Sequence, residues 1–443
     1  MDRATSYPLE PHLGVTLQSG REQNRDARKF FVFLIAVSLP LLFYSLWQIG
    51  LSVVHLGAHE SGDFGIILCG PRSFLLDSQM SPYQKCGRTP LAGFLYPPLS
   101  ILFLLPLAAM QTGIAFIVQF VLSAALLGVI LVALRDLSGE EWPRDRFKHV
   151  VLLVLIVSLA PVMLTLLEGH LNIIVLATFV TALVLASKRY NRTAGLIVSI
   201  GFWLKLYPAM LGGLFLARRE LRPAAFWAVG CALVFAVLGL MVLPLSLYIE
   251  YFTVFLPTMQ EFSVPGRTQS ITGQLLSLQT DLGTHIATGE LPFVSRPLPF
   301  SLHLLSDAVL MLGGGLALLR MQKGEPDSGR PLEALAILLL TLLLYSPVAW
   351  DHHFVLAIPA IAVLLMRLNR GTSRIQQVLI ASCWFALTVP VWTSFPQRLL
   401  SLPGGSFMAG LFYMRYTLSA LCMMGLLIAP RLRDDFALLR LRQ

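Results

Sequence analysis

Stretches of about 20 mainly apolar residues recur along this chain from residue 29 to residue 430. The hydrocarbon core of a bilayer is about 30 Å thick, and a helix of that length can cross it. Such stretches fold as helices because backbone polar groups find no other partner in lipid. Only 13% of the residues are charged, against about 25% in soluble domains. The sequence therefore predicts an all-α polytopic membrane protein without a soluble catalytic domain.

The apolar runs predict about 11 to 13 transmembrane or re-entrant helices. We expect them at 29–54, 97–112, 114–134, 149–167, 170–187, 193–217, 223–247, 299–320, 332–347, 353–367, 375–394 and 405–430. Two regions, 97–134 and 193–217, break the alternation of sides, so short or re-entrant helices are expected there. Pro208 is the expected break in the second region, because proline interrupts a helix.

The positive charges fix the expected orientation. Seven clusters hold 25 of the 33 Lys and Arg residues, and the positive-inside rule places all seven in the cytoplasm. The prediction is one integral-membrane domain, 29–430, between a cytoplasmic tail at 1–28 and a basic cytoplasmic tail at 431–443. Residues 55–95 and 248–298 then form outside loops. The net charge of +9 needs no nucleic-acid partner, since no basic patch is interleaved with aromatic residues.

The first outside loop carries a candidate catalytic acid. Residues 64–78 suit short amphipathic helices on the membrane surface better than a span, and Asp63 precedes them. Asp63 is either a helix N-cap or a carboxylate that accepts a proton from a hydroxyl. Cys69 and Cys86 share this loop and could pair in an oxidising compartment, but spacing alone leaves a disulfide and free thiols equally open.

Ionisable residues also interrupt the apolar runs. The stretch Glu168-Gly-His170-Leu-Asn172 forms a short outside turn, where Gly and Asn are common for conformational reasons. Lys205 lies in an apolar run, and such a residue faces a cavity or a partner unless it snorkels to the interface. Arg415 lies deep enough in the last span to need an anionic partner.

The stretch Trp350-Asp351-His352-His353 separates two apolar runs at the expected outer interface. Adjacent residues on a helix point about 100° apart, so both histidines are poor candidates for ligands of one metal ion. Two interpretations remain. The stretch is an interfacial polar anchor, or one histidine binds an anionic head group while the other makes an orienting contact.

Several short motifs together resemble the glycosyltransferase 87 family, the polyprenyl-phosphate-mannose-dependent mannosyltransferases of the GT-C membrane superfamily. In chain order the motifs are Gly62-Asp63-Phe64, Ser81-Pro82-Tyr83, Tyr96-Pro97-Pro98, Glu168-Gly-His170-Leu-Asn172, Leu204-Lys205-Leu-Tyr-Pro208 and Ser346-Pro347-Val-Ala-Trp350-Asp351-His352-His353. The resemblance spans residues 29 to about 370 and implies a GT-C type fold. It also implies a site on the outer face of a bacterial plasma membrane.

The resemblance implies a sugar, most often mannose, passed from a polyprenyl-phosphate donor to a hydroxyl of a glycolipid or glycan acceptor. It makes Asp63 the general base of an inverting reaction. The phosphate leaving group gains charge, so nearby cations would stabilise it, and the candidates are Lys205, His352, His353 and Arg415. The substrate-binding candidates are Tyr96, Glu168, His170, Asn172, Gln269 and Asp351.

Two departures from the family's pattern concern substrate contacts. The family often has Gln at the position of His170, and Asn at the position of Thr268 in Thr268-Gln269-Ser270. No obligatory metal is expected, although Asp351 with Glu168 could hold a cation. The alternative functions are a lipid or lipid-glycan transporter, which would equally explain charges inside the membrane, and another membrane transferase such as a polysaccharide ligase.

Overall fold

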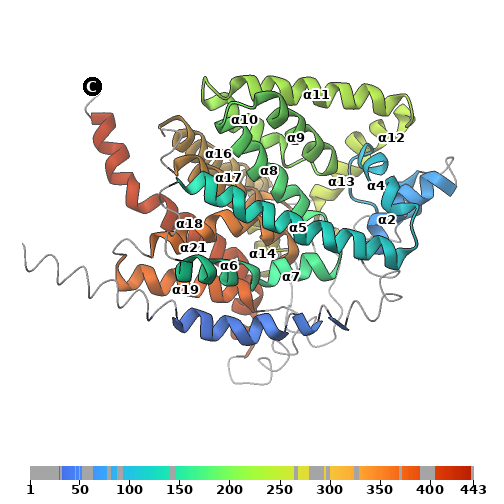
Figure 1. Ribbon diagram of the computed structural model, residues 1–443. Coiled ribbons are helices and arrows are strands. Elements are labelled where there is room, and N and C mark those ends of the chain that lie inside the picture. Colours follow the sequence, from blue (N-terminus) through green and yellow to red (C-terminus); the bar gives the residue numbers. More distant parts are fainter. Residues whose placement is uncertain are drawn as a thin grey trace, which may run out of the picture.

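The computed structural model describes most of the chain, and Figure 1 shows its arrangement. The described residues are 29, 32–44, 46–48, 50–51, 63–76, 81–86, 93–139, 146–263, 268–278, 294–295, 300–323, 329–368, 372–389 and 405–440. The predicted cytoplasmic tail 1–28 lies outside them. So do residue 60 and, within the predicted outside loop 248–298, residues 264–267, 279–293 and 296–298.

Helices make up nearly all of the described structure, which confirms the all-α prediction. They are α2 Asp63–Leu76, α3 Pro82–Lys85, α4 Ser100–Ala108, α5 Thr112–Ser138, α6 Arg146–Val157, α7 Ala160–Leu167, α8 Asn172–Ser187, α9 Asn191–Leu204, α10 Ala209–Ala217, α11 Arg222–Leu240, α12 Leu245–Glu250, η3 Tyr251–Phe255, α13 Leu256–Glu261, α14 Ile271–Leu278, α16 Phe300–Lys323, α17 Arg330–Tyr345, η4 Asp351–Ala357, α18 Ile358–Arg367, α19 Arg374–Thr388 and α21 Gly405–Arg440. The one described sheet pairs β1 Phe262–Ser263 with β2 Val294–Ser295, antiparallel.

Several described helices suit a membrane span by length and composition. Four single helices qualify: α5, α11, Phe300–Gln322 of α16 and Met408–Ala429 of α21. The bent pair α6 and α7 makes a fifth candidate. Other apolar helices are shorter, such as α8 and α17 with 16 residues each, below the usual minimum of about 17. The chain is thus a polytopic membrane protein built from both long and short helices.

Helix breaks occur where proline allows a helix to restart. α9 ends at Leu204 because Lys205 is extended, with φ −154° and ψ 134°, and α10 starts after Pro208. This confirms the predicted break within 193–217. A second break was not predicted: α6 and α7 meet at 55° within the expected helix 149–167. There Leu159 is extended, and Pro161 lies in the first turn of α7, where its missing N–H is tolerated.

The centre of the bundle is formed by α17 and α18. Every α17 residue from Pro331 to Leu344 is buried, as is every α18 residue up to Met366. A helix that is apolar all round belongs in a core. In contrast α11 lies at an edge of the bundle (Figure 1) and exposes apolar side chains such as Phe226 and Leu233, as a lipid-facing helix does. The short helix η4 joins α17 to α18 and is therefore fixed by this centre.

Helix α2 is tied to the bundle at several points. A disulfide joins Cys69 of α2 to Cys86, with the two Cα atoms 5.7 Å apart. The guanidinium of Arg72 donates hydrogen bonds to the carbonyls of Ala108 and Met110 and to the hydroxyl of Thr112. One face of the helix is buried and the other ends in exposed Leu75 and Leu76, as expected of an interfacial helix.

Candidate active site

Polar residues from four segments meet at one end of the bundle, and each segment lies at the end of a helix. Asp63 is the first residue of α2, and the turn 168–172 joins α7 to α8. Lys205 directly follows α9, and η4 directly precedes α18. Charged groups at helix ends avoid burial in the middle of the bundle, where an unpaired charge is most costly.

The turn between α7 and α8 depends on Gly169. Its φ is +66°, a conformation that side chains rarely adopt. A Cβ atom there would lie 2.5 Å from the ring of Phe64, the neighbour of Asp63. The amide of His170 donates to the carbonyl of Thr165, which closes the turn. Gly169 thus lets the turn approach the start of α2 closely enough for the two polar groups to meet.

The ring of His170 bridges two carboxylates. Its Nε2 lies 3.1 Å from Oδ2 of Asp63 and 2.9 Å from Oε2 of Glu168. The side chain of Asp63 remains 38% exposed while that of His170 is only 8% exposed. Asp63 is therefore anchored on one side by an imidazole and open on the other to an incoming molecule.

His352 completes this cluster from η4. Its ring stacks on that of His170 with the ring centroids 3.6 Å apart, and its Nδ1 lies 3.4 Å from Oε2 of Glu168. The backbone carbonyl of His352 accepts hydrogen bonds from Thr165 and from the side-chain amide of Asn172. These contacts fix η4 against the turn 168–172.

The contacts favour ionised carboxylates. The hydrogen bond from His170 lowers the pKa of Asp63 even though burial opposes the shift. Burial would raise the pKa of Glu168, but hydrogen bonds from His170 and His352 hold it well below its usual range. The pKa of His170 is raised: burial opposes its charge, and the bonds to Asp63 and Glu168 outweigh burial. Burial, followed by the nearby His170, lowers the pKa of His352 to about 4. At neutral pH Asp63 is accordingly a carboxylate, the form a general base requires.

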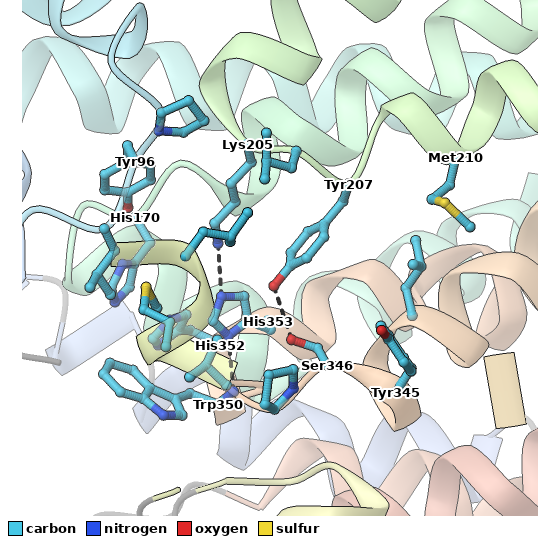
Figure 2. A pocket seen from close by; sticks show the side chains of 18 of the residues that line it. Tyr96, His170, Lys205, Tyr207, Met210, Tyr345, Ser346, Trp350, His352 and His353 are labelled. Atoms are coloured by element: carbon cyan, nitrogen blue, oxygen red, sulfur yellow. Dashed lines mark hydrogen bonds between the residues drawn. The ribbon is translucent and has the colours of Figure 1, made fainter. Parts of the chain in front are cut away.

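A second set of contacts surrounds Lys205. Its Nζ lies 2.6 Å from Oδ1 of Asn172 and 2.8 Å from Nε2 of His353. The other ring nitrogen of His353, Nδ1, accepts a hydrogen bond from the backbone amide of Trp350 at 2.9 Å. Figure 2 shows the two bonds on either side of the His353 ring. The amine, which sequence places in an apolar run, is thus held by two side chains from different helices.

A cavity of about 310 Å³ opens beside these groups. Its polar lining residues include His170, Lys205, His352 and His353, and its apolar lining residues include Met210, Leu256, Met259 and Leu342. Tyr207 crosses the cavity to hydrogen-bond Ser346 at 3.1 Å (Figure 2). A cavity lined by both polar and apolar side chains suits an amphipathic ligand.

Four side chains of the site come close enough to raise the question of a metal ion. One ligand atom from each of Asp63, Glu168, His170 and His352 lies within 4.8 Å of the others. The two imidazole rings, however, are stacked at 24°, so their in-plane lone pairs run nearly side by side instead of converging. With the rings in this arrangement, both histidines cannot bind one ion at the usual 2.0–2.1 Å.

The structure gathers most of the predicted site residues. Tyr96 lines the cavity, and its carbonyl accepts a hydrogen bond from the hydroxyl of Tyr83. Gln269 is a backbone anchor: its amide donates to the carbonyl of Ala349, and its carbonyl accepts from the hydroxyl of Thr417. It therefore fixes part of the large outside loop over η4.

Arg415 and Asp351, like Gln269, are not brought to the cavity. The guanidinium of Arg415 donates to the carbonyls of Phe412 and Val389 and packs on the ring of Tyr416 at 4.3 Å. Asp351 lies near Tyr416 as well. Neither residue is among those that line the described cavity.

Several residues that line the cavity are not indicated by the sequence. Tyr207 and Trp350 belong to motifs that resemble the family, but the motifs do not indicate that these two side chains line a cavity. Tyr251 and Met259 follow α12 in a region that the sequence predicts as an outside loop. Aromatic and apolar residues in an outside segment are the sequence feature that could have indicated a ligand-binding role for them.

An apolar helix bundle with carboxylates, imidazoles and an amine gathered around a cavity at one end has the architecture of a polytopic membrane enzyme. The family model of glycosyltransferase family 87 matches residues 94–347, more than half of the chain. The chain belongs to this family and is a membrane glycosyltransferase. The matched region includes Glu168, His170 and Lys205, while Asp63 lies before it.

Two characterised relatives extend the similarity beyond that region. The chain is 24% identical over 394 residues to the polyprenol-phosphate-mannose-dependent alpha-(1-2)-phosphatidylinositol mannoside mannosyltransferase of Mycobacterium tuberculosis, which covers 85% of this chain and 87% of the relative. It is 29% identical over 342 residues to the corresponding pentamannoside mannosyltransferase of Mycolicibacterium smegmatis, covering 74% of this chain and 75% of the relative.

Proposed function

We propose that this protein transfers mannose from a polyprenyl-phosphate donor to a hydroxyl of a lipid-linked or cell-envelope glycan, with inversion at the sugar carbon. Both relatives carry polyprenol-phosphate mannose in their names as the donor. The observation that carries the proposal is the pairing of Asp63 with His170 beside a cavity that also holds Lys205.

The chemistry assigned to Asp63 is proton removal. Its carboxylate takes the proton of the acceptor hydroxyl while the oxygen attacks the sugar carbon. The bond from that carbon to the phosphate oxygen breaks, and its electron pair stays with the phosphate. One base is enough because the reaction passes through no covalent enzyme intermediate, and the exposed part of the Asp63 side chain leaves room for the acceptor.

The cavity suits the lipid-phosphate donor. Lys205, His352 and His353 line it and can hydrogen-bond a phosphate. Met210, Leu256 and Met259 are among its apolar lining residues and suit the first units of a polyprenyl chain. The proposed mechanism includes no obligatory metal ion, although Asp63 and Glu168 with one of the two histidines could hold a cation.

The site is proposed to face the outside of a bacterial plasma membrane. Three helices have a residue of the site at one end and a basic residue at the other. Helix α8 begins at Asn172 and is followed by Lys188, and α9 has Arg192 in its first turn and is followed by Lys205. Helix α18 follows η4 and ends at Arg367. The basic ends belong in the cytoplasm by the positive-inside rule. The site then lies at the opposite surface, with both termini in the cytoplasm.

The test is transfer by the purified full-length protein. Radiolabelled polyprenyl-phosphate mannose is supplied with a lipid extract of the host membrane, and the label is expected to move into a glycolipid. Glucose and arabinose donors run in parallel identify the sugar. If no sugar moves from any lipid-phosphate donor, the proposal fails. A Glu60→Cys variant tests orientation: labelling only by a reagent confined to the cytoplasmic side would contradict the outward-facing site.

A further inference from the structure

The hydrogen bonds around Lys205 determine which of its neighbours can donate and which must accept. The side-chain amide of Asn172 donates through Nδ2 to the carbonyl of His352 at 3.2 Å. A carbonyl only accepts, so the amide orientation of Asn172 is fixed. Its Oδ1 therefore faces Lys205 and accepts one N–H of the amine at 2.6 Å.

His353 is fixed in the same way. Its Nδ1 accepts the backbone amide hydrogen of Trp350, so Nδ1 carries no proton. A neutral imidazole has one N–H, and here it must be on Nε2. That hydrogen points at the Nζ of Lys205, 2.8 Å away. The amine must then accept it through a lone pair.

An ammonium group has three N–H donors and no lone pair. It could donate to Nε2 of His353 only if both ring nitrogens were bare, which would require an imidazolate. A neutral amine satisfies both contacts: it donates to Asn172 and accepts from His353. Both hydrogen bonds of Lys205 are therefore satisfied only when its amine is uncharged.

We propose that Lys205 is a neutral amine before the reaction and takes up a proton as the leaving phosphate gains its second negative charge. This inference rests on the proposed function. The donor is a phosphodiester with one negative charge, and the released polyprenyl phosphate carries two. The proton that Asp63 removes from the acceptor passes through water to Lys205. When the phosphate leaves, Lys205 returns that proton to water, so protons and charges balance over the cycle.

The surroundings of Lys205 explain why this arrangement helps catalysis. The titratable groups around it are His353 and His352 of η4, His170 of the turn before α8, and Tyr207, whose ring lies 5.7 Å from the amine. Among the residues that line the described cavity, Lys205 is the one Lys or Arg. A charge that appears only as the phosphate becomes doubly charged stabilises the transition state more than the bound donor, which raises turnover.

Proton uptake on binding a phosphate monoester tests the proposal directly. Farnesyl phosphate is titrated into the full-length protein in detergent at pH 8, where a phosphate monoester is already doubly charged because its second pKa is about 6. Calorimetry in buffers of different ionisation enthalpy counts the protons. We expect the parent protein to take up about one proton per bound ligand.

Three variants separate the possible origins of that proton. Lys205→Met is expected to bind farnesyl phosphate more weakly and without proton uptake. Lys205→Arg carries a permanent charge and is expected to bind without uptake. Lys188→Met removes an exposed lysine that pairs with Asp136 far from the site and is expected to keep the uptake of the parent.

The outcomes distinguish the two proposals. Binding by the parent without proton uptake, or equal uptake by Lys205→Arg, overturns the neutral amine. Failure of the parent to bind farnesyl phosphate at all overturns it too, since the phosphate must reach Lys205. If proton uptake is seen but no sugar is transferred from polyprenyl-phosphate donors, the proposed function fails while the assignment of Lys205 stands.

Discussion

Asp63 and His170 meet through a single pair of atoms, Oδ2 and Nε2, at 3.1 Å. The two residues come from different parts of the chain, the start of α2 and the turn before α8. Because this contact lowers the pKa of Asp63, the proposed base is ionised as described only when α2 lies in this position. The neighbours of this pair, Gly169 and the disulfide of α2, can be tested together with the pair itself.

Replacing the proposed base should slow catalysis strongly without unfolding the protein. Asp63→Asn keeps the size of the side chain but cannot accept the acceptor's proton. We expect kcat to fall about 10²- to 10⁴-fold, with binding of the donor retained, measured by radiolabelled mannose transfer. Asp136→Asn is the control, because Asp136 pairs with exposed Lys188 away from the site. Equal activity of Asp63→Asn and the parent would remove Asp63 from the mechanism.

Replacing His170 should move the pH dependence. His170 is the main cause of the lowered pKa of Asp63, so the parent loses its base only when the pH falls below the ordinary carboxyl range. In His170→Gln a neutral amide replaces the ring, the pKa of Asp63 rises, and activity is lost at a higher pH as the solution is acidified. The measurement is kcat/KM against pH. An unchanged acid limb would show that His170 does not set the ionisation of Asp63.

Adding one methyl group at Gly169 should separate the turn from α2. The backbone there has φ +66°, and a Cβ atom would press on the ring of Phe64. We expect Gly169→Ala to cost about 1–3 kcal/mol of stability and to lower turnover because Asp63 is displaced. Thermal unfolding and mannose transfer measure the two effects. Gly212→Ala is the matched control, since its Cβ atom would meet nothing within 4 Å.

Removing the disulfide should loosen the helix that carries Asp63. Cys69 and Cys86 are separated by 17 positions. A disulfide that closes a loop of about that size stabilises the folded protein by about 3 kcal/mol. We expect the double variant Cys69→Ser, Cys86→Ser to have a lower Tm and lower turnover. Cys231→Ser, which changes a free cysteine, serves as the control. An unchanged Tm in the double variant would mean that the other contacts of α2 suffice.

Much of the architecture could be predicted from local signals. The apolar runs predict the helical class. Pro208 predicts the break between α9 and α10, because a proline lacks the N–H that a helix needs. Asp63, the turn 168–172 and the stretch 350–353 were placed at helix ends on the same side. Their placement needed only helix lengths and the distribution of positive charges, which are properties of the sequence itself.

Contacts between distant segments could not be predicted in this way. Nothing local to Phe64 indicates that it packs on Gly169, because that contact depends on how α2 folds back on the bundle. Arg415 was grouped with the donor phosphate on the basis of its charge, yet its guanidinium lies between aromatic rings and backbone carbonyls. Charge and depth do not reveal which face of a helix a side chain occupies.

The anchoring of Gln269 has a consequence for synthesis of the protein. Its amide is held by Ala349 and its carbonyl by Thr417, and both partners emerge from the ribosome after it. The last of them belongs to the final described helix, α21. Gln269 can therefore be held by Ala349 alone until the last helix has been inserted, and the second anchor forms only then. A chain that ends before α21 would leave this part of the outside loop fixed at one point instead of two.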